Sequence, residues 1–445
     1  MFTNRDLRKL IIPLIVEQVL MALMGAVDTV MVTSVGTAAI SGVSLVDSIN
    51  ALVVDLLTAL ATGGAIICSQ YLGRGDREHS CRAAQQVILA SFTASLLIMA
   101  FCLATRSWLL RVIFGTVEPE VMENALIYFF ITALSYPFVA LFGAGSALYR
   151  SGGNSRISMI ISVSTNILNI VGNAILIFVF NMGAAGAALS TLVSRIIAAV
   201  VILICLRRRD QVVEVGSYLR IRPDFHIIWL VLCVGLPTGI ESGMFQFGKL
   251  VVQSTVSTLG TTAIAANAIL AVMELFSSKP SMGIGYALMT VVGQCMGAGR
   301  PDEARYYIKK LTLWSTAVLL VTNWLIYFIT PTVMRVSGLD PDASRMAMQV
   351  LLVISIVKPI IWPMAFTPSN GTRAAGDARF NMIATSCTMW IFRVGLTTVL
   401  CRFMGVGLIG IWAGYMVDWL MRAAIFALRL RTEKWHSHHL IEDIE

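Results

Sequence analysis

The feature that most constrains this chain is a long apolar run near its start, residues 10–35, which reads LIIPLIVEQVLMALMGAVDTVMVTSV. A membrane-spanning helix needs about 20 predominantly apolar residues, so this run is long enough to cross a bilayer with some tilt. The run nevertheless contains two carboxylates, Glu17 and Asp28, spaced so that both lie on one face of a helix. Because an ionisable group at membrane depth is costly, each is a candidate functional residue.

The same run recurs 224 positions later, which indicates an internal duplication. Its matching positions are Pro13, Glu17, Gly36, Thr37, Ala39 and Ile40 in the first copy and Pro237, Glu241, Gly260, Thr261, Ala263 and Ile264 in the second. A Q-x-x-G-x-G motif occurs further on at the same offset, with Gln70, Gly73 and Gly75 matching Gln294, Gly297 and Gly299. The sequence RSGGNSRISMI at 150–160 then matches RAAGDARFNMI at 373–383 at an offset of 223. We interpret the chain as two halves of one duplicated unit.

Composition indicates an integral membrane protein. Charged residues make up 13% of the chain, about half the usual share in a soluble protein, and 57% of residues are hydrophobic, with a mean hydropathy of +0.79. The formal charge of +8 does not indicate nucleic-acid binding, because the basic residues lie in short loops between apolar runs. The eight cysteines form no C-x-x-C pair and fall mostly inside the runs, so we expect unpaired thiols and no metal site.

Hydropathy predicts an all-α protein with about twelve membrane helices, six in each half. The apolar windows are 10–35, 46–69, 87–105, 124–148, 157–180, 184–206, 227–257, 264–292, 311–330, 347–370, 381–400 and 405–428. Because the first run is long, contains two acids and is duplicated, we interpret it as a first span and not as a cleaved signal peptide. An even number of spans returns each half to its starting side, which predicts parallel repeats related by a pseudo-twofold axis along the membrane normal.

The predicted organisation has four parts. They are an N-terminal six-helix lobe (1–206), a basic cytoplasmic linker (207–224), a C-terminal six-helix lobe (225–430) and a cytoplasmic tail (431–445). One side of the membrane would hold most loop arginines and lysines, and the other only Arg106, Arg111, Arg335, Arg345 and Arg402. The positive-inside rule then predicts a multi-pass protein of the cell (inner) membrane with both termini cytoplasmic. The histidines of the tail are interpreted as part of a solvated end, with metal binding the less favoured alternative.

Besides the two acids of the first run, further charged side chains lie inside predicted spans. They are Asp55, Arg195, Glu241, Lys249, Glu274, Lys279, Lys358, Arg393, Asp418 and Arg422. Lipid tolerates few such groups, so their number predicts a hydrated cavity between the halves. Asp418 and Arg422 are four residues apart on one helix, which predicts a structural ion pair. Arg195 and Arg393 are interpreted as packing residues or headgroup anchors.

Three acids of the spans are candidates for transport chemistry. Glu17 and Glu241 hold equivalent positions, one helical turn after a proline, so they either face each other across a central path or act as polar anchors bonded to neighbouring helices. Asp28 has no acidic counterpart, since Val252 is in its place. An acid that only one half possesses predicts a task that only one half performs, here the binding of a proton or a cation.

Asp55 and Lys279 are equivalent positions of opposite charge on the second helix of each half. Equivalent helices meet only near the pseudo-twofold axis, so a bond between the two side chains would form a gate between the lobes. The alternative interpretation is two separate pairs within the lobes, for instance Lys279 with Glu274.

The sequence does not predict an enzyme. GVGLIG at 405–410 matches G-x-G-x-x-G literally, but no strand precedes it, and we interpret it as small residues that open a closely packed membrane helix. No nucleophile elbow appears, and no carboxylate pair has a catalytic spacing. A membrane-embedded enzyme is therefore the less favoured class.

The chain resembles the multidrug and toxic compound extrusion (MATE) transporters over essentially its whole length. The resemblance rests on the two Pro-bearing opening helices, the Q-x-x-G-x-G motif after each second helix and R-x-x-G-[ND]-x-R after each fourth, and above all on VDTVMVTSVGTAAISGVSL at 27–45. The family implies cation-coupled export of organic, often cationic, compounds through a central cleft by alternating movement of two lobes.

The resemblance also implies residue roles. Asp28 matches the family's first-helix acid, which in one branch lies in a polar cluster of the first lobe, and the cluster here would contain Asn169, Asn173 and Thr191. That branch has an aspartate at the position of Asn173, so a proton site made of two carboxylates is not preserved. A second branch binds Na⁺ through a seventh-helix glutamate, where this chain has Phe245, and a tenth-helix aspartate, where it has an apolar stretch, so that sodium site does not transfer directly.

We therefore expect a secondary antiporter that exports organic compounds in exchange for H⁺ or Na⁺, with Asp28 as the coupling residue. The substrate path would contain Glu17, Glu241, Phe245 and Gln246, with 22 Met and 20 Phe in the chain to make it adaptable. We expect small-molecule substrates, the lipid bilayer as a further partner, no nucleic acid, a functional monomer, and no cofactor besides the coupling ion. The alternative transport function is a lipid-linked oligosaccharide flippase of the related exporter superfamily, although its pyrophosphate would need a cationic cleft.

Overall fold

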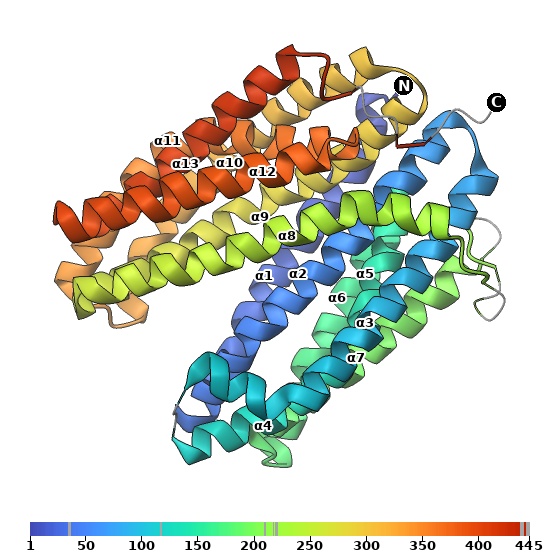
Figure 1. The fold of residues 1–445 in the computed structure, drawn as a ribbon. Coiled ribbons are helices and arrows are strands. Elements are labelled where there is room, and N and C mark those ends of the chain that lie inside the picture. The colour runs from blue at the N-terminus through green and yellow to red at the C-terminus, as the bar shows by residue number, and fades with distance from the viewer. Residues whose placement is uncertain are drawn as a thin grey trace. The chain divides into compact units, whose positions relative to one another are not determined.

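The computed structural model describes residues 1–33, 37–115, 118–208, 211–216, 218, 221–436 and 440–441, without the side chains of residues 28, 29, 32, 33 and 37–39. This part of the chain is almost entirely helical and contains no strand (Figure 1). The first half contains α1 (Asn4–Thr33), α2 (Thr37–Arg74), α3 (Arg77–Phe114), α4 (Pro119–Leu134), α5 (Tyr136–Ser151), α6 (Ser155–Asn173), η1 (Ala174–Val179) and α7 (Gly183–Leu206). The second contains α8 (Phe225–Val256), η3 (Ser257–Leu259), α9 (Thr261–Gly297), α10 (Pro301–Val336), α11 (Pro341–Ala374), α12 (Ala378–Thr388), η4 (Met389–Leu396), η5 (Val399–Phe403) and α13 (Leu408–Arg431).

The predicted membrane spans are confirmed. Eleven helices of the described chain are long and apolar enough to cross a bilayer, and α4 with α5 gives a twelfth as a pair bent by 44°. The bend was not predicted from the single apolar window at 124–148. It arises at Pro137, which has no N–H for the carbonyl four residues earlier and whose ring excludes a straight continuation. Ser135, between the two helices, directs both its backbone N–H and its hydroxyl to the Thr132 carbonyl oxygen.

The described chain forms two compact units, named here the N unit (Leu20–Gly239) and the C unit (Met1–Val19 with Ile240–Glu445). Their limits divide α1 and α8, so the first part of each half's first helix belongs with the other half. These units are defined by packing, whereas the predicted lobes are defined by the sequence repeat, and the lobe limits stay a prediction.

In the N unit, α2 packs against α3, α4 and α5 around buried apolar residues such as Val46, Phe129 and Tyr136. The first part of α8 crosses α2 at two glycines. A Cβ added to Gly63 would lie 2.7 Å from the backbone nitrogen of Gly235, so only glycine allows the two helix backbones to approach this closely.

In the C unit, α9, α10, α11 and α13 pack together around a core that includes Leu270, Ile354 and Trp412. The first part of α1 crosses α9 at Gly283, whose added Cβ would lie 2.9 Å from the backbone nitrogen of Ile15. The same arrangement occurs in the N unit. In each unit, the first part of the other half's first helix packs against the second helix, α8 against α2 and α1 against α9.

Both repeated motifs form the same turns in the two halves. Gly75 and Gly299 end the Q-x-x-G-x-G motifs with φ of 86° and 67°, and Gly153 and Gly376 occupy the R-x-x-G turns with φ of 82° and 106°. L residues rarely adopt this left-handed conformation at a helix C-terminus, which explains the glycines. The motifs therefore encode the ends of helices at equivalent places in the two halves.

Candidate functional site

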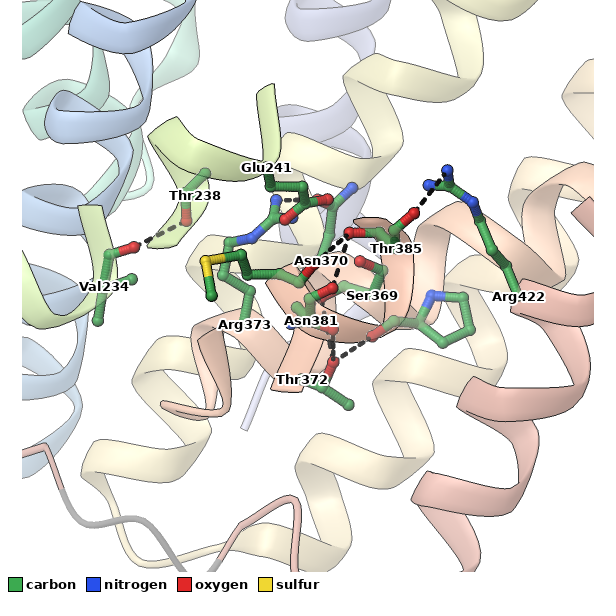
Figure 2. Close-up of polar contacts among 12 residues, drawn as sticks. Val234, Thr238, Glu241, Ser369, Asn370, Thr372, Arg373, Asn381, Thr385 and Arg422 are labelled. Carbon is green, nitrogen blue, oxygen red and sulfur yellow. Dashed lines mark hydrogen bonds and ion pairs between the residues drawn. The ribbon is translucent and has the colours of Figure 1, made fainter. Parts of the chain in front are cut away.

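In the C unit, Glu241 of α8 is paired with Arg373 at the end of α11. Arg373 Nη2 donates to Glu241 Oε2 at 2.7 Å, and Nη1 donates to Asn370 Oδ1 at 3.1 Å (Figure 2). The Glu241 side chain is 17% exposed and that of Arg373 is 11% exposed. The charge of Glu241, a predicted residue of the substrate path, is thus balanced by a cation in this structure.

Next to this pair, Asn381 of α12 connects α12 to α11. Thr372 donates its hydroxyl to Asn381 Oδ1 at 3.0 Å, and Asn381 Nδ2 donates to the Ser369 carbonyl oxygen at 3.1 Å (Figure 2). One turn later, the Thr385 carbonyl oxygen accepts a bond from Arg422 Nη2 of α13 at 3.2 Å. The Glu241–Arg373 ion pair therefore lies next to a set of hydrogen bonds that joins α11, α12 and α13.

Asp418 of α13 is fully buried between two arginines. Arg422 Nε donates to its Oδ1 at 2.9 Å, which confirms the predicted i, i+4 pair, and Arg393 Nη2 lies 2.9 Å from Oδ2. The Arg393 guanidinium also lies 4.4 Å from the ring centroid of Tyr415 and 5.1 Å from that of Phe245. Aromatic faces attract cations, so these rings stabilise the charge that one carboxylate shared by two arginines leaves uncompensated.

Another buried ion pair of the C unit joins Glu274 of α9 to Lys358 of α11. Lys358 Nζ lies 3.0 Å from Glu274 Oε1, and its side chain is completely buried, whereas that of Glu274 is 25% exposed. The sequence offered Lys279 as a possible partner for Glu274. Lys358 could not be identified in that role, because helix packing alone brings α11 against this turn of α9.

In the N unit, the structure brings together part of the predicted coupling cluster. Asn169 Nδ2 of α6 donates to Thr191 Oγ1 of α7 at 3.2 Å, and Ser190 donates its hydroxyl to the Asn169 carbonyl oxygen at 2.8 Å. Asn173, one turn after Asn169, is completely buried. Asp28 lies on α1, but its side chain is outside the described structure, so its place in the cluster stays a prediction.

A polar centre around Asp47 of α2 was not predicted from the sequence. Asp47 Oδ1 accepts hydrogen bonds from the Tyr128 hydroxyl at 3.2 Å and from Asn50 Nδ2 at 3.3 Å, and Asn50 in turn accepts one from Tyr136 at 2.8 Å. Asp47 is solvent-exposed, and these donors are neutral. The sequence did show an acid here, because Asp47 is the second residue of the apolar window 46–69. Its position at the edge of the window meant that it was not counted among the charges of the spans.

For the remaining predicted residues, the structure gives the burial or the unit to which each belongs, but not whether they act together. Glu17 is buried in the part of α1 that belongs to the C unit, and Phe245 and Gln246 of α8 are half-buried. Asp55 lies on α2 in the N unit and Lys279 on α9 in the C unit, so the gate pair stays a prediction.

Outside the spans, Asp76 caps α3 in the turn after α2. Its carboxylate accepts a bond from the His79 backbone N–H at 2.9 Å and lies 2.6 Å from His79 Nδ1. Burial raises the pKa of Asp76, but these interactions with His79 outweigh that effect, and the pKa of Asp76 lies below its ordinary value.

The described residues contain no group of three or more His, Cys, Asp or Glu side chains placed to hold a metal ion. All eight cysteines are free thiols. The polar centres are instead ion pairs and hydrogen-bonded clusters inside the two units. Together with the apolar spans and the repeated halves, they define an integral membrane protein with charged centres at membrane depth.

Comparison with known proteins identifies the class more closely. The MatE family profile matches twice, at residues 13–175 and 237–399, so the chain belongs to the MatE family of transporters. The two matches are offset by 224 positions, which confirms the internal duplication and the predicted two-repeat architecture.

Several known proteins align along nearly the whole of this chain. The chain is 26% identical over 446 residues to the "Probable multidrug resistance protein NorM" of Thermotoga maritima, covering 98% of this chain and 94% of that one. It is 22% identical to "Multidrug and toxin extrusion protein 2" of Mus musculus, covering 95% and 73%. A solved structure of a multidrug resistance MATE family transporter in an outward-facing conformation is 20% identical, with a TM-score of 0.88 and coverage of 96% and 94%.

Proposed function

We propose that this protein exports small organic compounds, many of them cationic, in exchange for H⁺ or Na⁺ by alternating access between two lobes. The observation that carries the proposal is the double MatE match over both halves, together with relatives that are named as multidrug resistance or multidrug export proteins. We place the protein in the cell (inner) membrane with both termini cytoplasmic, in accord with the distribution of basic loops.

Asp28 is the proposed coupling residue, with Asn169, Asn173 and Thr191 as its polar surroundings. The contact between Asn169 and Thr191 supports this role, because it places amide and hydroxyl groups together at the level of the spans. Uncharged groups can stabilise a bound proton or cation without competing with it for the carboxylate.

The proposed substrate path contains Glu17, Glu241, Phe245 and Gln246. In the described structure Arg373 balances the charge of Glu241. A cationic substrate that binds Glu241 would therefore take the place of Arg373, and the two states of the pair would accompany substrate binding and release. The proposed gate pair, Asp55 with Lys279, would close the outer side when the path opens inward.

Dye efflux tests this function. Inverted membrane vesicles containing the protein would receive a fluorescent organic cation and be given first a pH gradient and then a Na⁺ gradient. We expect transport of the dye under one of the two gradients and none in vesicles without the protein. Failure of both gradients to drive transport, combined with translocation of a lipid-linked oligosaccharide, would favour the flippase alternative.

A further inference from the structure

Lys358 lies inside a cage of four oxygen atoms provided by a single turn of α9. Its Nζ is 3.0 Å from Glu274 Oε1, 3.1 Å from the Glu274 carbonyl oxygen, 2.6 Å from Ser277 Oγ and 2.7 Å from Ser278 Oγ. The cage thus combines a carboxylate, a carbonyl and two hydroxyls around one positive charge.

The cage is built by the local sequence of α9. Glu274, Ser277 and Ser278 are spaced i, i+3 and i+4, so their side chains lie on one helix face. Ser278 donates its hydroxyl to Glu274 Oε1 at 2.8 Å, and Ser277 donates to the Glu274 carbonyl oxygen at 2.9 Å. Both bonds are made within α9, and the same two serine oxygens accept hydrogen bonds from Lys358.

Carboxylate, carbonyl and hydroxyl oxygens are the ligand types that hard cations prefer in proteins. We propose that this turn of α9 is a monovalent-cation site of the Na⁺ type, which the ammonium of Lys358 occupies as a tethered cation. The C unit would then need no free Na⁺ at this position, because the chain supplies the charge itself.

The proposal and an ordinary buried ion pair differ in the effect of removing the lysine. In an ordinary pair, Lys358 only neutralises Glu274, and its loss leaves a carboxylate that no small ion replaces. Here all four oxygens come from one helix turn that holds them by its own hydrogen bonds. A quarter of the Glu274 side chain is exposed, and the proposal requires that a small ion enters the vacated cage from this side.

The test compares the thermal unfolding of detergent-solubilised wild type and Lys358→Ala in NaCl and in choline chloride at equal ionic strength. We expect Na⁺ to raise the unfolding midpoint of Lys358→Ala saturably by about 2–4 °C relative to choline and to leave the wild type unchanged. Lys249→Ala, which removes an exposed lysine of the same unit, is the matched control and should show no Na⁺ effect.

The double variant Lys358→Ala, Glu274→Gln removes the charge of the cage and should also lose the response to Na⁺. Equal midpoints of Lys358→Ala in both salts would overturn the proposal, as would an equal response of the single and double variants. The proposal would also be overturned if the double variant can be isolated folded but Lys358→Ala cannot, in either salt. Na⁺ would then have failed to replace the ammonium.

If the protein is the proposed antiporter, the cation site would affect which ion it needs. The existence of the site itself does not depend on that function. Ion binding is measured in detergent without a gradient, so the cage can be disproved while export is intact. Conversely, export can fail while the cage binds Na⁺.

Discussion

At the scale of single residues, the acids of the spans differ in what neutralises them. Asp418 has two arginines, Glu274 has Lys358, and Glu241 has Arg373, whereas the hydrogen-bond donors to Asp47 are neutral. A carboxylate that is paired with cations from other helices holds those helices together. We therefore infer that the C-unit pairs hold the helices of that unit together.

Asp418→Asn tests this structural role. The substitution leaves Arg393 and Arg422 without their shared carboxylate, and breaking a buried pair in this way costs about 3–5 kcal/mol. We expect a large fall in the unfolding midpoint in detergent. Asp302→Asn, at an exposed acid of the same unit, should change stability by less than about 0.5 kcal/mol. Similar small effects of both substitutions would contradict the assignment.

At this scale the sequence predicted part of the site. The pair Asp418 and Arg422 could be predicted because both residues lie on one helix, where spacing determines contact. The partners of Glu274 and Glu241 are 84 and 132 positions away along the chain, and only the packing of α11 against its neighbours selects them. Asp47 was missed because it lies at the edge of an apolar window.

At the scale of elements, close helix crossings and helix caps determine which surfaces meet. Gly63 and Gly235 allow the backbones of α2 and α8 to approach closely, and Gly283 does the same for α9 and α1. Hydropathy predicted these helices as spans but gave neither their crossings nor the bend between α4 and α5. Apolar content does not encode backbone approach or the missing N–H of Pro137.

Gly63→Ala tests the crossing in the N unit. The added Cβ would lie 2.7 Å from Gly235 N and 2.8 Å from the Val231 carbonyl oxygen, so α8 must shift, at a cost of about 1–3 kcal/mol. Gly143→Ala on α5 is the matched control, because its Cβ would meet nothing within 4 Å, and it should leave stability unchanged or raise it. Thermal unfolding in detergent measures both. An equal effect of the two substitutions would refute the crossing.

Asp76→Ala tests the cap of α3. We expect a loss of about 1 kcal/mol at neutral pH, measured by thermal unfolding. The lowered pKa of Asp76 means that its contribution is fully present above the unfolded-state value near 4 and is lost as the pH falls through the folded-state value. The difference between wild type and variant should therefore shrink below about pH 4, and a difference independent of pH would argue against the charged cap.

At the scale of the whole molecule, the duplication is the dominant fact. The offset of 224 could be predicted from a few proline, glycine and glutamate positions, and the two MatE matches confirm it. The packing of the first part of α1 in the C unit and of the first part of α8 in the N unit could not be predicted. A repeat shows which segments are equivalent but not which of them pack together. This packing does mean that each unit is built from both halves.

The proposed gate tests how the lobes move. If Asp55 and Lys279 bond when the outer side is closed, Asp55→Asn or Lys279→Met should destabilise the closed state alone and shift the population toward outward-open. A Leu56→Cys reporter in a cysteine-free background should then be labelled faster from outside, and the double swap Asp55→Lys, Lys279→Asp should restore part of the wild-type rate. Unchanged labelling in both single variants would exclude the gate.

Coupled exchange through Asp28 is the central claim, and ion movement driven by substrate measures it most directly. Purified protein in liposomes would receive a substrate gradient, while an internal pH dye and ²²Na⁺ report which ion moves. We predict movement of one of the two ions opposite to the substrate in the wild type, and loss of that movement in Asp28→Asn with the protein still inserted and folded. Substrate transport with neither ion moving, or normal coupling in Asp28→Asn, would contradict this mechanism.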